Sequence, residues 1–146
     1  MTARNFLIFL LGFLSLGALV GGGLLIIDPS GRLLGTPLSM LDTSPFSNFL
    51  IPAILLFFVI GILPLLVVIG LIKNSISPFA EYFNCFQDMH WSWSYTLYIS
   101  FVLIIWIQVQ EILINGVHFL HSFYMFWALL IIFVTQLTEV KKMYRK

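Results

Sequence analysis

Residues 47–72 read SNFLIPAILLFFVIGILPLLVVIGLI, a run of 26 residues without a charged side chain. Three more apolar runs occupy about residues 5–27, 93–114 and 118–138. At a rise of about 1.5 Å per residue, roughly 20 residues cross a hydrocarbon core of about 30 Å, so each run is long enough for a transmembrane helix. The sequence therefore predicts an integral membrane protein of the all-α class, with residues 1–146 forming a single membrane domain.

Composition narrows the range of functions. Hydrophobic residues make up 60% of the chain and charged residues 9%, which leaves little sequence for a water-soluble domain. The net charge of +1 gives no sign of a nucleic-acid partner, and we expect none. Cys85 is the single cysteine, which excludes a Cys-x-x-Cys redox centre. Because no Walker loop, nucleophile elbow or serine triad is recognisable, a non-enzymatic protein is favoured, and no particular cofactor is indicated.

The basic residues predict the orientation, because short loops rich in Lys and Arg stay on the cytoplasmic side. With four spans, both termini and the middle loop share one side, and only Arg32 falls on the other. We therefore expect both termini to be cytoplasmic, in a protein of the bacterial inner membrane whose lipid bilayer is its first partner. The six basic residues that share the predicted cytoplasmic side are Arg4, Lys73, Lys141, Lys142, Arg145 and Lys146.

The first span carries small residues at a spacing that suits close helix packing. Gly17 and Gly21 are four residues apart, and Ala18 and Gly22 repeat this spacing one residue later. Small residues let two helix backbones approach closely in lipid. The pattern predicts packing within this chain, with a homodimer through Gly17, Ala18, Gly21 and Gly22 as the alternative.

The segments between the spans contain turn and cap signals. Asp28-Pro29-Ser30-Gly31 is typical of a β-turn, so we expect the outward loop between spans one and two to fold back as a cap. Ser77-Pro78 predicts the start of an interfacial helix whose aromatic side chains recur at helical spacing up to His90. Pro64, inside the second span, predicts a kink near Ile60 and Gly61.

Several of these stretches resemble a family of small bacterial four-helix membrane proteins. The resemblance is carried by residues 28–31, 34–38, 44–46 and 49–52, then by Ile105-Trp106-Ile107 with Gln110, and by Phe119-Leu120 with Tyr124. It implies a four-helix membrane fold. No established activity comes with that family, so no functional residue is carried over, and Glu111, His118 and His121 are departures from its pattern.

One group of polar side chains is predicted near the outer ends of spans three and four. Ionisable groups inside a membrane are costly and therefore invite a functional interpretation. We predict that these residues form a candidate ligand-binding site, with Asp28 and Asp42 arriving from the outward loop. The full set is Gln108, Glu111, Asn115, His118, His121, Ser122, Asp28 and Asp42.

Three interpretations of this group stay open. The residues can hydrogen-bond one another and fix the outer end of the helices, or they can line a pocket for a ligand or a lipid headgroup. In the third interpretation Glu111, His118 and His121 bind a metal ion or handle protons, although two histidines and one carboxylate are a weak metal signature.

The short connections predict an up-down-up-down four-helix bundle, with a structured outward loop and an interfacial helix between spans two and three. The function that we expect is binding of a lipid, an apolar small molecule or a partner membrane subunit. A membrane enzyme or metal-binding protein with an outer-leaflet site at Glu111, His118 and His121 is the alternative. A subunit of an oligomeric channel or transporter is the second alternative.

Overall fold

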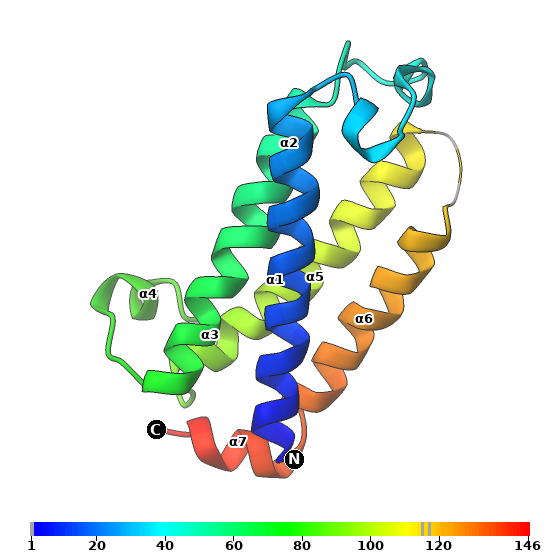
Figure 1. Ribbon diagram of the computed structural model, residues 1–146. Coiled ribbons are helices and arrows are strands. Elements are labelled where there is room, and N and C mark those ends of the chain that lie inside the picture. The colour runs from blue at the N-terminus through cyan, green and yellow to red at the C-terminus, as the bar shows by residue number, and fades with distance from the viewer. Residues whose placement is uncertain (1, 115, 117) are drawn as a thin grey trace.

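The computed structural model describes residues 2–114, 116 and 118–146, and within these it is built from helices (Figure 1). The first long segment is α1. The second is a continuous run of three elements, α2, the π-helical η3 and α3. Two short 3-10 turns, η1 and η2, lie in the loop between them, and α4 to α7 follow. Their bounds are α1 Ala3–Ile27, η1 Arg32–Leu34, η2 Leu38–Leu41, α2 Leu50–Leu55, η3 Leu56–Ile62, α3 Leu63–Lys73, α4 Pro78–Tyr82, α5 Trp91–Leu113, α6 Phe119–Thr135 and α7 Thr138–Tyr144.

Three of these segments are long and apolar enough to cross a membrane. They are Ala3–Ile27, Leu50–Lys73 and Trp91–Leu113, which match the predicted spans to within a few residues at each end. A fourth span is possible if α6 and α7 are counted as one bent helix. These segments fit an integral membrane protein. α1 packs against both the second segment and α6, while α5 packs against α3 and α6.

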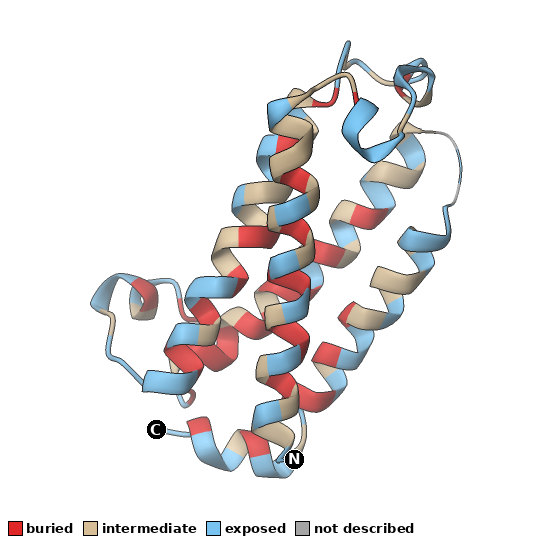
Figure 2. Ribbon diagram, in the orientation of Figure 1, coloured by how far each residue is buried: buried red, intermediate tan, exposed pale blue. Residues whose placement is uncertain are grey.

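The fourth apolar run does not form one helix over residues 118–138. α6 ends at Thr135 after 17 residues, or about 25 Å, and α7 is bent from it by 66°. The chain turns at Gln136 and Leu137, where polar residues begin to replace the apolar ones. α7 then lies across the end of the packed helices and buries Val140 and Tyr144 there (Figure 2).

Upstream of Pro64, where the sequence predicts a kink near Ile60 and Gly61, the structure has the π-helical η3, and the kink itself stays a prediction. Proline has no backbone N–H, so the regular helical hydrogen-bond pattern is interrupted on its N-terminal side. Beside this segment the Ser15 hydroxyl on α1 donates to the Gly61 carbonyl at 2.6 Å, which ties η3 to α1.

The small residues of α1 pack inside the chain. A Cβ placed on Gly22 would lie 3.0 Å from both the Cβ and the backbone nitrogen of Phe57, so α1 and η3 approach closely at this point. Gly17 lies against the hydroxyl group of Tyr124 on α6, because a Cβ there would be 2.9 Å from that oxygen. The prediction of packing within the chain is confirmed at these two positions, while the homodimer stays a prediction.

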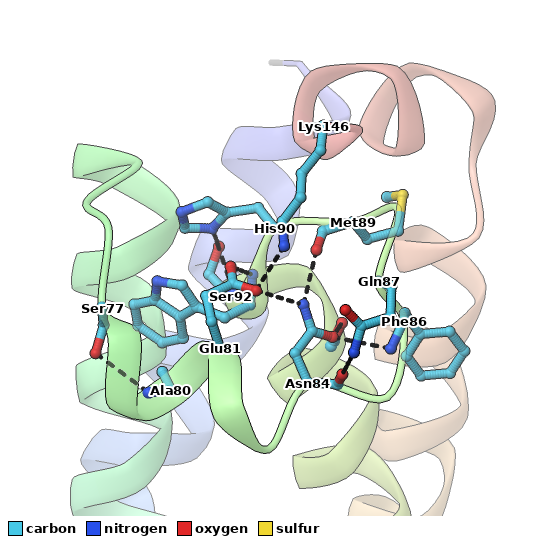
Figure 3. Close-up of polar contacts among 12 residues, drawn as sticks. Ser77, Ala80, Glu81, Asn84, Phe86, Gln87, Met89, His90, Ser92 and Lys146 are labelled. Atoms are coloured by element: carbon cyan, nitrogen blue, oxygen red, sulfur yellow. Dashed lines mark hydrogen bonds and ion pairs between the residues drawn. The ribbon is translucent and has the colours of Figure 1, made fainter.

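The predicted interfacial helix is much shorter than expected. Ser77 caps α4 by accepting a hydrogen bond from the Ala80 N–H, but α4 ends at Tyr82. The following residues turn around the buried side chain of Asn84, which donates to the Met89 carbonyl at 2.8 Å (Figure 3). An asparagine that bonds the nearby backbone in this way competes with helix formation, which explains the early end of α4.

The two chain ends meet at one end of the packed helices (Figure 1). Arg4 donates to the Tyr144 hydroxyl at 3.0 Å and to the carbonyls of Leu71 and Ile72 at 3.2 Å. A cation is favourable at the C-terminal end of α3, where free carbonyls gather. We call this the terminal end, and the opposite end, which carries residues 28–49, the loop end.

Candidate functional site

A cavity of about 370 Å³ lies among α1, η3, α5 and α6, beneath the residues of the loop end. Its deep part is lined by apolar side chains from the four helical segments, including Leu14, Ile60, Leu103 and Ile107. Gly17 and Gly21 contribute backbone rather than side chains to the wall from α1. At Gly21, where a Cβ would meet no atom within 4 Å, the cavity occupies space that a larger residue would fill.

The loop over the cavity is held in place by hydrogen bonds. Phe49 donates its N–H to the Pro29 carbonyl at 3.0 Å, which joins the two ends of the loop. The Thr43 hydroxyl donates to the Leu113 carbonyl at 2.6 Å, which ties the loop to the end of α5. Leu41 and Phe49 are buried and line the cavity from this side. The predicted fold-back of the loop is present.

The predicted turn at the start of this loop is also present. Gly31 donates its N–H to the Asp28 carbonyl at 3.1 Å, and its φ of 81° is one that glycine adopts readily. The hydroxyl and the backbone N–H of Ser30 both donate to the Asp28 carboxylate, and they lower the pKa of this group. Asp28 thus stabilises the turn and is not part of the cavity wall.

His118 and His121 form the start of α6 and also line the cavity. Nδ1 of His118 accepts from the Leu120 N–H at 3.3 Å, and Nδ1 of His121 accepts from the His118 N–H at 3.1 Å. A ring nitrogen that accepts a hydrogen bond carries no proton, so in the neutral ring the proton is assigned to Nε2. Each ring therefore retains one N–H donor that the helix start does not use.

The other residues of the predicted polar group are not brought together in the cavity wall. Gln108, Ser122 and Asp42 are exposed, Glu111 is half-buried, and Asp28 belongs to its turn. Asn115 lies outside the described residues. Among the residues that the structure describes, no three His, Cys, Asp or Glu side chains are grouped as metal ligands. In the same part of the chain no hydrogen bond involves the Glu111 carboxylate, so the structure gives no support there to the interpretation in which the polar residues bond one another.

The rotation of α5 explains why Gln108 and Glu111 are absent from the wall. The side of the helix that faces the cavity is defined by Leu103, Trp106, Ile107, Gln110, Leu113 and Ile114. At about 100° per residue, Gln108 is turned roughly 160° from the middle of this side and Glu111 roughly 100°. The two predicted residues therefore project elsewhere, while their neighbour Gln110 takes the cavity position.

Five polar or aromatic residues of the described wall were not predicted as site residues: Thr36, Phe49, Trp106, Gln110 and Tyr124. Trp106 and Gln110 share a face of α5 with Leu103, so their helical spacing was the available signal. The N–H of the Trp106 indole is buried and has no acceptor among the described residues. An unpaired buried donor costs about 1–3 kcal/mol, so an acceptor on a bound molecule would be favourable near this side chain.

The wall carries no Asp, Glu, Lys or Arg side chain among the described residues. Thr36, Gln110, His118 and His121 supply polar groups toward the loop end. Further in, the wall is apolar except for the Trp106 indole N–H, one helical turn from Gln110, and the Tyr124 hydroxyl beside Gly17. Such a site suits a molecule with an apolar body and a neutral polar end.

Comparisons of the chain with family models, with curated proteins and with solved structures find no match.

Proposed function

We propose that this protein is a four-span membrane protein that binds an apolar molecule in the cavity at its loop end. In this proposal α1, the α2–η3–α3 segment, α5 and α6 cross the bilayer as an up-down-up-down bundle. The basic residues Arg4, Lys73 and Lys142 belong to the terminal end, which favours a cytoplasmic location for both termini. The cavity then opens in the outer half of the membrane, with the bacterial inner membrane as the proposed location.

The observation that supports binding is the size and polarity of the cavity. The cavity measures about 370 Å³ and is lined mainly by apolar side chains. Water does not fill the apolar part favourably, since it would find few hydrogen-bond partners there. An apolar occupant is therefore favoured over water.

The test is to fill the cavity from one side. Gly21 lines the wall, and a Cβ placed on it meets no atom within 4 Å, so Gly21→Leu should place its side chain in the cavity without a clash. Gly12, on the same helix, also has free space around a Cβ but does not line the cavity. Gly12→Leu is therefore the matched control.

Benzophenone is a suitable probe because it is apolar, neutral and photoreactive. After irradiation of the detergent-solubilised protein, we expect labelling of Leu103 or Ile107, which are 3% and 2% exposed and line the cavity. The labelling should disappear in Gly21→Leu and persist in Gly12→Leu. The proposal would be contradicted if neither residue were labelled in the wild-type protein. It would also be contradicted if Gly21→Leu were labelled at these residues as strongly as the wild type.

A further inference from the structure

We infer that the occupant of the cavity is an acyl chain of a glycerolipid, which moves in sideways from the bilayer between α1 and α6. This inference rests on the proposed function and names the class of ligand. Three observations support it: the length of the cavity, the distribution of polar groups along it, and the opening between the two helices.

The length of the cavity suits one hydrocarbon chain. Along α1 the wall extends from Leu14 to Leu25, which corresponds to about 17 Å of helix. A flexible acyl chain can extend along this mostly apolar wall, parallel to α1.

The polarity of the wall matches a chain that ends in an ester. The deep residues Leu14, Ile60 and Leu103 offer only apolar contacts. Toward the loop end, Gln110 and His121 offer N–H donors that an ester carbonyl can accept. A free carboxylate is less suitable, because burying a charge without a partner of opposite sign is costly and the described wall has no Lys or Arg.

The contact between α1 and α6 is closed in the terminal half. The Trp127 indole N–H donates to the Leu10 carbonyl at 2.9 Å, and the rings of Trp127 and Phe13 lie with centroids 4.5 Å apart. From there the two helices diverge toward the loop end (Figure 1).

The loop half of the same contact is open. Gly21 on α1 has no neighbouring atom within 4 Å of a Cβ position. On the facing part of α6, Leu120 lines the cavity and is nevertheless 51% exposed, so the cavity is continuous with the outside of the protein here. In a bilayer this side faces lipid, which makes a lipid chain the nearest apolar molecule.

The experiment uses the full-length protein in phosphatidylcholine vesicles. A small fraction of the lipid is replaced by a phosphatidylcholine with a diazirine near the methyl end of one acyl chain. After irradiation, labelled residues are identified by mass spectrometry of peptides. The exposed residues Phe126 and Phe133 on α6 report labelling by the surrounding lipid and serve as an internal control.

We expect the lipid probe to label Leu103 or Ile107 in the wild-type protein and in Gly12→Leu. In Gly21→Leu this labelling should fall at least about tenfold relative to Phe126 and Phe133, because the added side chain takes the space of the acyl chain. The ratio to the control residues corrects for differences in reconstitution between variants.

The outcome separates this inference from the proposed function. If the lipid probe labels Phe126 and Phe133 but never Leu103 or Ile107, while benzophenone still labels the interior, the cavity binds another class of molecule and the inference is wrong. If neither probe reaches Leu103 or Ile107, both proposals fail. Interior labelling by lipid that is equal in Gly12→Leu and Gly21→Leu also overturns the inference.

Discussion

Gly21, Gly22 and Gly23 are adjacent in the sequence, yet alanine should be less favourable at Gly22 than at the other two positions. At Gly22 an added Cβ would lie 3.0 Å from the backbone nitrogen of Phe57, whereas at Gly21 it meets nothing within 4 Å and at Gly23 only ordinary contacts from 3.7 Å. Replacing glycine by alanine inside a helix gains about 1 kcal/mol. Overpacking against backbone costs about 1–3 kcal/mol.

The helix gain is common to all three variants, so it cancels when they are compared. Gly21→Ala and Gly23→Ala should each be more stable than the wild-type protein by about 1 kcal/mol, and Gly22→Ala should be about 1–3 kcal/mol less stable than either. The free energy of unfolding can be measured by reversible titration of detergent micelles with sodium dodecyl sulfate. If Gly22→Ala were as stable as Gly21→Ala, the close packing of α1 on η3 would be refuted.

Two further predictions concern the terminal end. Tyr144→Phe removes the hydroxyl that accepts a hydrogen bond from Arg4 and donates one to the Leu71 carbonyl at the end of α3. It should therefore lower the free energy of unfolding by about 1–3 kcal/mol. Tyr82→Phe, at an exposed position, is the control and should have no effect in the same titration. Burial alone would raise the pKa of Glu81. The hydrogen bonds to its carboxylate, of which the bond from Lys146 at 2.6 Å has the largest effect, outweigh burial and hold the Glu81 pKa below its usual value. This carboxylate therefore stabilises the protein at neutral pH and stops doing so as the pH falls through its lowered pKa. Melting temperatures measured from neutral to acid pH should decrease less steeply in Glu81→Gln than in the wild type, and parallel curves would contradict the assignment.

The membrane helices could be predicted because hydrophobic length is a property of the sequence itself. The runs at 5–27, 47–72 and 93–114 correspond to Ala3–Ile27, Leu50–Lys73 and Trp91–Leu113. The bend after Thr135 was missed, since it depends on the burial of Val140 and Tyr144 against other helices. The short α4 was missed for a similar reason: Asn84 finds its partner Ser94 on a different helix.

The candidate site was only partly predictable. His118 and His121 were identified because polar residues are conspicuous in an apolar sequence, and both line the cavity. The cavity itself depends on a missing side chain at Gly21 and on the rotation of α5 that turns Gln110 inward. A search for chemical groups does not detect missing volume, so the deep apolar wall was not anticipated.

Because the described cavity wall carries no charged side chain, the membrane potential should not affect how often the cavity is occupied. Moving one elementary charge through a membrane potential of 100 mV involves about 2.3 kcal/mol of work. A neutral chain that moves between the bilayer and an uncharged wall carries no charge through the field, so the voltage does no work on it. Occupancy of this cavity would then follow the chemical composition of the surrounding lipid and be electrically silent.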